Sequence, residues 1–440
     1  MAKISLISVC HTDYTGQIVS KLEDDAYNTL TSMGNEVLLH SDITDIDKAR
    51  KAVRHTLSSD VNGVVLLLSG WIECSVAMTV AKNLKALPFC LLGVPMFEFQ
   101  GKLESTGSYV SYAMFNGSLN RLKYKFYGIL GNLSDKDTAA KLKSFCSAAY
   151  AFTRLNNAKI ALFGYTSMSI YTGTFDHLFM REKIGPEIEH IDSYTLINVA
   201  ESMDDKDIEK ASEKLYGKAI VSSDISSSIL KKTLSIYCAL TSLTDKHKWD
   251  AVNVKCQYEF SKEYKAVPCV ALSMLADTGT VASCEGDILC TVSMLMLSLL
   301  SGDTVSYGDT INHSGNVLTL SACGFMPFSM GKEEKKVTNF MPHEGFTGIQ
   351  CGFCGKEGKV TALRLVEDLG SYHFICFTGT AKDTPLRQGY MPAADIELCG
   401  SIDKLIDNYN GQHFAFCYGD YLKDVMVLSK LLGIQTITLL

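Results

Sequence analysis

Short apolar runs alternate with helix-like segments over the first two-thirds of the chain. The runs that predict strands in the first part cover residues 4–9, 36–40, 63–68 and 89–92. The segments that predict helices between them cover residues 15–33, 45–58 and 74–87. Short buried strands that alternate with helices are typical of a parallel, doubly wound sheet. We therefore expect a first α/β lobe over residues 1–155.

A second alternating series follows a helix-like stretch over residues 137–154. Its expected strands cover residues 158–164, 187–191 and 219–222, with helices that start at residue 204 and end near residue 244. The first of these strands ends in the turn Gly-Tyr-Thr-Ser-Met-Ser. This series predicts a second, Rossmann-like α/β domain over residues 156–265.

The pattern changes after residue 265, where glycine turns separate strand-like runs. These runs cover residues 305–307, 315–320, 348–352, 358–365 and 372–378, before a helix at 422–432 and a strand at 436–439. Strands joined directly by turns are typical of antiparallel sheet. The sequence therefore predicts an α/β protein: two doubly wound α/β lobes, then a mixed α+β C-terminal domain with antiparallel sheet over residues 266–440.

The composition indicates a globular protein. Of the 440 residues, 47% are hydrophobic and 20% are charged, and the formal net charge is −7. An acidic balance argues against nucleic acid or an anionic membrane as the main partner. The apolar N-terminal run is too short for a signal peptide, and the run at 288–300 is too short to span a membrane. These features favour a cytoplasmic protein that binds neither nucleic acid nor membranes.

The cysteines indicate a reducing compartment. There are 15 of them, an odd number, scattered through expected strands and helices of a large chain. The one Cys-x-x-Cys pair, Cys351 and Cys354, falls in an expected strand, where positions three apart face opposite sides. That placement suits neither a zinc knuckle nor a redox motif, so we interpret the cysteines as structural.

Three residues with metal-binding side chains stand at element boundaries. Glu285 lies in Ala-Ser-Cys-Glu-Gly-Asp before a long apolar helix, Asp309 closes the strand-like Thr-Val-Ser-Tyr-Gly-Asp, and His413 precedes another strand. Two carboxylates and an imidazole can hold a divalent cation with positions left open for a substrate. Each residue also has a simpler interpretation: a helix N-terminal acid, a turn aspartate and a buried core histidine.

Several common catalytic motifs are missing from the sequence. No G-x-G-x-x-G follows the first strand, and there is no Walker A sequence, which leaves nucleotide binding without support. There is also no G-x-S-x-G elbow and no H-E-x-x-H helix.

Four segments have a distinctive content and order: residues 160–179, with their glycine turn and Asp-His pair, 284–296, 306–309 and 411–434. In both respects they resemble the L-fucose isomerase family and, more distantly, L-arabinose isomerase. The resemblance spans residues 150–440 and is weaker before that. Gly286 replaces the family's asparagine, and Thr310 begins a stretch that also differs.

The resemblance implies an aldose–ketose isomerase that works through an enediol. Glu285 and Asp309 would bind the metal and transfer protons, and His413 would be the third ligand. An oxygen-rich set with one imidazole favours Mn²⁺, with Mg²⁺ or Co²⁺ as alternatives. The resemblance also implies a homo-oligomer, a hexamer built from trimers, in which the first lobe of one subunit covers its neighbour's site.

Substrate contacts are expected from residues outside the metal set. Gln257 matches a family position near the sugar, and Trp71 follows a strand end, where an aromatic ring can pack on a sugar face in the neighbouring subunit. His343 and Arg387 are candidates to bind substrate oxygens or an anionic substituent. Lys255 is the second choice after Arg387 for the anionic substituent. The substrates that this leaves open are L-fucose, D-arabinose, L-arabinose and a 6-substituted hexose such as sulfoquinovose.

Two other classes of function remain open at this point. One is a non-catalytic sugar sensor, since paired α/β lobes also build binding proteins. The other is a metal-dependent lyase or epimerase that uses the same enediolate. Turnover of an aldose would exclude the sensor, and the identity of the product would decide between isomerase and lyase.

Overall fold

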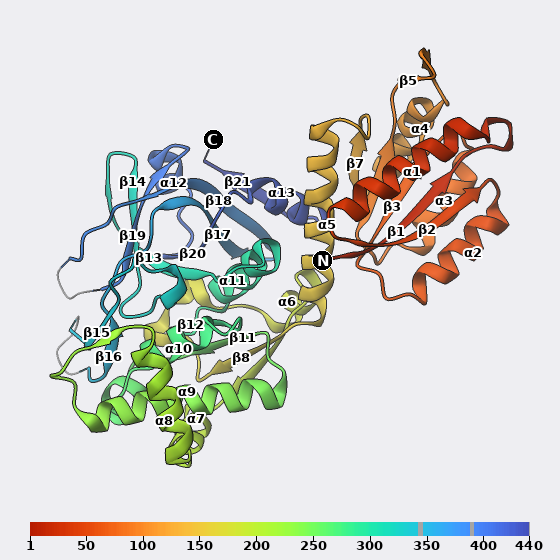
Figure 1. Ribbon diagram of the computed structural model, residues 1–440. Helices are drawn as coiled ribbons and strands as arrows, with labels where there is room; N and C mark the ends of the chain where they lie inside the picture. Colours follow the sequence, from red (N-terminus) through yellow and green to blue (C-terminus); the bar gives the residue numbers. More distant parts are fainter. Residues whose placement is uncertain (342–345, 388–390, 440) are drawn as a thin grey trace. The chain divides into compact units, whose positions relative to one another are not determined.

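The computed structural model describes residues 1–341, 346–387 and 391–439. The chain divides into two compact units, each with its own sheets (Figure 1). The first contains Met1–Arg154 and Lys423–Ile434, and the second contains Leu155–Leu422 and the residues from Gln435 onward. The domain limits drawn from the sequence at residues 155 and 265 stay a prediction.

A five-stranded sheet in the order β2-β1-β3-β4-β7 forms the first unit, and all its pairings are parallel. Its strands are β1 (Lys3–Val9), β2 (Glu36–Ile43), β3 (Gly63–Leu68), β4 (Phe89–Gly93) and β7 (Tyr127–Leu130). The helices are α1 (Gln17–Ser32), α2 (Ile46–Leu57), α3 (Cys74–Asn83), α4 (Ser108–Arg121), α5 (Lys136–Asn157) and α13 (Leu422–Leu432). A small hairpin is formed by β5 (Phe97–Phe99) and β6 (Lys102–Glu104).

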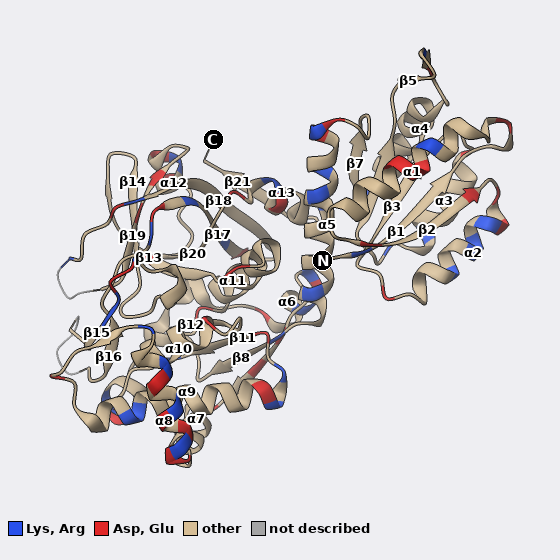
Figure 2. Cartoon of the chain, in the orientation of Figure 1, with Lys and Arg blue, Asp and Glu red and all other residues tan. Residues whose placement is uncertain are grey.

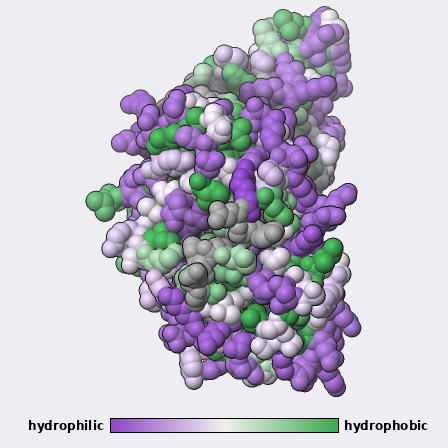
Figure 3. Space-filling model, turned by 90° about the vertical axis from the view of Figure 1, so that its left-hand side faces the viewer, coloured by the Kyte–Doolittle hydropathy of each residue, from purple (hydrophilic) through white to green (hydrophobic). Residues whose placement is uncertain are grey.

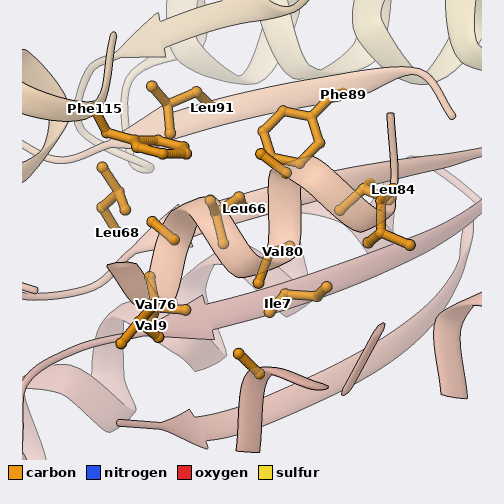
Figure 4. Close-up of a cluster of buried hydrophobic side chains, with 14 of the residues drawn as sticks. Ile7, Val9, Leu66, Leu68, Val76, Val80, Leu84, Phe89, Leu91 and Phe115 are labelled. Carbon is orange, nitrogen blue, oxygen red and sulfur yellow. The ribbon is translucent and has the colours of Figure 1, made fainter. Parts of the chain in front are cut away.

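The core of this unit lies between the sheet and its helices. Figure 4 shows strand side chains such as Leu66 and Phe89 among those of α3, such as Val76 and Val80. Strand β3 is buried along its whole length. A strand with no exposed face is typical of a parallel sheet that is covered on both sides.

The second unit contains a four-stranded parallel sheet in the order β12-β11-β8-β9. Its strands are β8 (Lys159–Phe163), β9 (Glu187–Ile191), β11 (Ala251–Val254) and β12 (Val281–Cys284). The helices of this region are α6 (His177–Lys183), α7 (Ser193–Glu201), α8 (Asp205–Tyr216), α9 (Ser227–His247) and α10 (Cys269–Ala276). A separate three-stranded sheet contains β10 (Ile220–Val221), β15 (Lys336–Asn339) and β16 (Ile349–Cys351).

An antiparallel sheet that closes on itself completes the second unit. The strands pair in the order β17-β20-β13-β14-β19-β18, and β18 pairs back with β17. They are β13 (Ser306–Ser314), β14 (Val317–Ser321), β17 (Gly358–Asp368), β18 (Ser371–Lys382), β19 (Ala393–Leu398) and β20 (His413–Tyr418). Strand β21 (Gln435–Thr438) adds in parallel to β18, and helix α12 (Ile402–Asp407) lies in the chain between β19 and β20.

Helix α11 (Ile288–Ser301) joins the parallel sheet to the barrel. It contacts β11 and β12 of the sheet and β13, β17 and β20 of the barrel. Its residues from Ile288 to Leu297 are buried without a break. A helix that is apolar all round is a core helix, which confirms the prediction made from its length.

The surface is mixed in character. Charged residues of both signs occur along helices such as α2 and α8 (Figure 2). The face drawn in Figure 3 is a mosaic of small hydrophilic and hydrophobic areas, as is normal for a protein surface. Within the described ranges, no helix combines the length and the apolar character needed to cross a membrane.

The predicted fold class is confirmed in its main features: a mixed α/β protein with parallel sheets and a C-terminal antiparallel sheet. Two local predictions are wrong. The strand expected to hold both Cys351 and Cys354 ends at Cys351. Asp309 does not close a strand, because β13 continues to Ser314, where it turns into β14 and pairs with it. Strand β12 was not anticipated in the stretch after residue 265, and it belongs to the parallel sheet.

Candidate metal centre

Glu285, Asp309 and His413 come together in the second unit, as the metal-site hypothesis requires. Each offers one ligand atom, and these atoms lie within 4.8 Å of one another. Nε2 of His413 lies 3.3 Å from Oε2 of Glu285 and 3.1 Å from Oδ1 of Asp309. The side chains of His413 and Glu285 are buried, whereas that of Asp309 is 25% exposed. Asp309 is therefore the member that an incoming molecule reaches most readily.

Strand pairing places two of the three residues. Asp309 on β13 lies directly opposite His413, the first residue of β20, in antiparallel register. Residues in such a pair project from the same face of the sheet with their side chains close together. The backbone N–H of Thr310 donates to the carbonyl of Gln412 over 2.8 Å and extends this ladder. The barrel thus supplies one carboxylate and the imidazole.

Glu285 comes instead from the parallel sheet, in the turn between β12 and α11. Its φ is +68°, an uncommon value for a residue with a side chain, and Gly286 follows at +72°. The N–H of Glu285 donates to the carbonyl of Val254, and its own carbonyl accepts from Ser167. A Cβ at Gly286 would lie 2.4 Å from the carbonyl oxygen of Tyr165. The turn that aims Glu285 at the barrel therefore needs glycine next to it.

Asp287 holds the imidazole from behind. Its Oδ2 accepts from Nδ1 of His413 over 2.8 Å and from Nη1 of Arg364 over 2.6 Å. Its Oδ1 accepts from the N–H of Cys290 and caps α11. Burial alone would raise the pKa of Asp287, but Arg364 and His413 hold it well below its usual range. With Nδ1 donating to this carboxylate, Nε2 is the nitrogen that faces Glu285 and Asp309.

The residues present fit a divalent cation. Nε2 of His413 is buried and makes no hydrogen bond among the described residues, although two carboxylate oxygens lie within 3.3 Å of it. Burial would lower the pKa of His413, but the carboxylates of Asp287, Asp309 and Glu285 raise it well above its ordinary value. Positive charge is thus favoured between these atoms. Two carboxylate oxygens and one imidazole nitrogen suit a cation such as Mn²⁺ better than a soft metal.

The nearby thiols do not compete for that position. Sγ of Cys323 lies 3.9 Å from Oε1 of Glu285, and Sγ of Cys284 lies 2.8 Å from the hydroxyl of Tyr307. Burial raises the pKa of Cys323, so it stays a neutral thiol and a poor ligand. All 15 cysteines are free, as the structural interpretation of the sequence predicts.

Two predicted residues lie on the same edge of the parallel sheet as Glu285. Lys255 and Gln257 follow β11, which is the neighbour of β12. Both side chains are buried, with exposures of 2% and 4%. The ammonium of Lys255 donates to Oε1 of Glu259 over 2.8 Å.

Three further residues were predicted to contact the substrate. Trp71 belongs to the first unit, where its ring meets that of His11 at a centroid distance of 5.4 Å. Arg387 forms an ion pair of 2.5 Å with Asp395 of β19. His343 lies outside the described residues. Substrate contact by these three residues stays a prediction.

Sequence reasoning missed Arg364, and it saw Asp287 only as part of the segment around Glu285. A signal for Arg364 was present, because it is the one charge in the apolar run from Ala362 to Val366 of β17. A lone charge in a fully buried strand needs a buried partner. The acid that follows Glu285 by two residues is that partner.

Comparison with known proteins points to sugar isomerases. No family model matches the chain. The sulfoquinovose isomerase of Priestia aryabhattai is 22% identical over 334 residues, which cover 72% of each chain. The sulfoquinovose isomerase of Clostridium sp. (strain MSTE9) is 21% identical over 324 residues, which cover 71% of each. The predicted similarity to sugar isomerases is confirmed at this level, and membership of the L-fucose isomerase family stays a prediction.

Solved structures add no argument about the fold. A solute binding protein of an ABC transporter from Bacillus halodurans C-125, with bound myo-inositol, is 12% identical and covers 69% of this chain and 90% of its own. Its TM-score is 0.20.

The turn at Gly286 gives a first testable prediction. Gly286→Ala adds a Cβ that meets the Tyr165 carbonyl, whereas Gly302→Ala has a matching φ of +73° and nothing within 4 Å. We expect Gly286→Ala to lower the free energy of unfolding by about 1–3 kcal/mol more than the control, because it adds a clash to the same backbone strain. Urea-induced unfolding of both variants checks this. Equal losses would show that the turn tolerates a side chain.

The carboxylate of Asp287, which contacts the imidazole of His413, gives a second testable prediction. We expect Asp287→Asn to weaken Mn²⁺ binding about 10- to 100-fold, because the charge that orients His413 is lost. Isothermal titration calorimetry measures this, with exposed Asp303→Asn at the far end of α11 as the control. An unchanged affinity in a folded variant would contradict the role given to Asp287.

Proposed function

We propose that this chain is a metal-dependent aldose–ketose isomerase that acts on an open-chain sugar through an enediol. The observation that carries the proposal is the convergence of Glu285, Asp309 and His413 on one point. The similarity to sulfoquinovose isomerases supports the reaction type. A sugar sensor needs no such set of ligands, so the sensor interpretation has less support.

Mn²⁺ is the cation we propose, with Mg²⁺ or Co²⁺ as possible substitutes, held by Glu285, Asp309 and His413. When bound there, it would supply Lewis-acid stabilisation for the negative charge that develops on the sugar oxygens at C1 and C2. The imidazole keeps its orientation through Asp287 while the substrate exchanges.

The two carboxylates are the groups that can move protons. Isomerisation transfers the C2 proton to C1 and a hydroxyl proton between the two oxygens. Asp309, which is partly exposed, can accept a proton from a sugar that arrives from outside, and Glu285 faces the same point from the opposite sheet. We therefore assign both acids to proton transfer as well as to ligation.

The proposed substrate is a deoxy- or 6-substituted aldose: an L-fucose-like sugar, a pentose or sulfoquinovose. The names of the relatives favour the last of these. We also propose a cytoplasmic homo-oligomer, a hexamer or another trimer-based assembly, in which Trp71 of one subunit contacts sugar bound to its neighbour.

The metal set gives a third testable prediction. We expect Asp309→Asn to reduce kcat by at least about 1,000-fold with little change in unfolding, because the variant loses both a ligand charge and a proton acceptor. Ketose formation in the presence of Mn²⁺ measures the loss. Chelation of the wild-type protein should abolish activity, and added Mn²⁺ should restore it. Near-normal turnover by the variant would sink the assignment.

A panel of sugars tests the reaction and the substrate class together. Neutral and 6-sulfonated aldoses are incubated with the Mn²⁺-loaded protein, and the products are identified by NMR. We expect the matching ketose, with no cleavage fragments and no C2 epimer as the main product. Fragments would identify a lyase, a C2 epimer an epimerase, and no turnover of any aldose would favour the sensor.

A further inference from the structure

The segment that follows β11 carries an unusual backbone. At Tyr258 φ is +67° and ψ is −75°, and the N–H of Glu259 donates to the carbonyl of Gln257 over 3.0 Å. This is a γ-turn of the rare, strained kind, with angles near about +75° and −65°. A π-helical turn follows at once over Glu259–Glu263. Both features are rare in proteins, and both cluster at functional sites.

This segment begins beside the metal centre. Val254 of β11 is the register partner of Cys284 of β12, so Lys255 and Glu285 are the next residues on neighbouring strands. The N–H of Glu285 donates to the carbonyl of Val254 over 3.1 Å. Neighbouring strands lie about 4.8 Å apart, which places the backbones of Lys255 and Glu285 side by side.

A glycine leaves room for the side chain of Lys255. Gly164, with φ at +90°, follows β8 directly, and a Cβ there would lie 2.9 Å from Cβ of Lys255. The ammonium of Lys255 lies 3.6 Å from the centre of the Tyr165 ring and donates to Oε1 of Glu259. Burial would lower the pKa of Lys255, but Glu259 and Tyr165 raise it above its ordinary value. The ammonium therefore stays charged.

Two buried acceptors in the segment have no donor. Oε1 of Gln257 and Oε2 of Glu259 are both buried and make no hydrogen bond among the described residues. The Gln257 side chain is nine-tenths buried, with 4% exposure. An unpaired buried acceptor is unfavourable, so each calls for a donor group from a ligand.

The donors and acceptors decide which ligand fits. A sulfonate or a fully ionised phosphate has only acceptor oxygens, so it would leave both acceptors unpaired and would face the charge of Glu259. A chain of hydroxyl groups offers O–H donors to Gln257 and Glu259, and its oxygens can accept from Lys255. We infer that Lys255, Gln257 and Glu259 form a subsite for hydroxyl groups of the substrate beyond C2, and that an anionic substituent does not bind there. This inference rests on the proposed function.

The experiment measures binding apart from turnover. An alditol, which cannot isomerise, is titrated into the Mn²⁺-loaded protein and its Glu259→Gln and Gln257→Leu variants by calorimetry. We expect each variant to bind the alditol about 10- to 100-fold more weakly with an unchanged affinity for Mn²⁺, because a charged or buried acceptor is lost. Glu263→Gln, exposed in the same π-helical turn, is the matched control and should bind as the parent does.

Deoxy sugars identify the substrate hydroxyl that contacts Glu259. The loss in Glu259→Gln should disappear for one analogue that lacks the hydroxyl at C3, C4 or C5, because that partner is then absent in both proteins. Circular dichroism confirms the fold of each variant, and Gln257→Asn provides a smaller change where Gln257→Leu does not fold.

An anion probe separates the alternatives. Sulfate should not displace the alditol. The inference is overturned if Lys255→Met removes binding of 6-sulfonated sugars alone and leaves alditols unaffected, in which case the isomerase proposal still stands. It is also overturned if the Glu259→Gln and Gln257→Leu variants bind the alditol as the parent does. A third outcome separates the two proposals. If those variants lose alditol binding and the wild type turns over no aldose, the subsite proposal stands and the isomerase proposal is wrong.

Discussion

The buried carboxylate of Asp287 is the constraint on which the rest of the second unit depends. It accepts from Arg364 of β17 and from His413 of β20, and it caps helix α11 from the turn after β12. One side chain thus ties the parallel sheet to the barrel. A buried ion pair is weak evidence of net stability, but removing one partner from it costs about 3–5 kcal/mol. The carboxylate of Asp287 therefore fixes the position of the parallel sheet against the barrel.

That connection explains how the candidate metal centre can be divided between two sheets. Asp309 and His413 face each other across one strand pair, so their separation is set by the barrel. Glu285 belongs to the other sheet and reaches them only through a strained turn. The strain persists because Val254 and Ser167 fix the backbone of Glu285 on both sides. The strained turn and the salt bridge act together to bring the third ligand to the other two.

The sequence predicted the parts of the site that carry a local signal. Acid and imidazole at element boundaries, with the order of segments that resembles L-fucose isomerase, indicated Glu285, Asp309 and His413. The same signal misplaced Asp309 at a strand end, because Thr310-Ile-Asn reads as a turn when the partner strand β14 is unknown. Gly286 looked like a departure from the family. The structure gives its reason, which is the close approach of the Tyr165 carbonyl, a contact between segments far apart in the chain.

Arg364 and the γ-turn at Tyr258 lay further from what a sequence can show. The arginine could be suspected from its apolar surroundings, but its partner could not be named without the strand order. The turn has no residue signature, since tyrosine does not favour positive φ. Its conformation is imposed by its surroundings, where the N–H of Tyr258 donates to Oγ of Ser261. The carbonyl of Ser261 accepts in turn from the N–H of Thr347, and a contact between segments so far apart is visible only in the folded chain.

The candidate metal ligands and the segment after β11 differ in how freely their side chains can be substituted. The candidate metal ligands are held by strand pairing and by the contact between Asp287 and His413, so substitutions there disturb the chemistry directly. The segment from Lys255 to Glu263 follows a strand end and holds its polar groups in one turn. Side chains on such a segment can be exchanged without moving Glu285, because the carbonyl that holds the Glu285 backbone belongs to Val254, which precedes the segment. In the proposed isomerase, discrimination among sugars can therefore vary through this segment while the reaction stays the same.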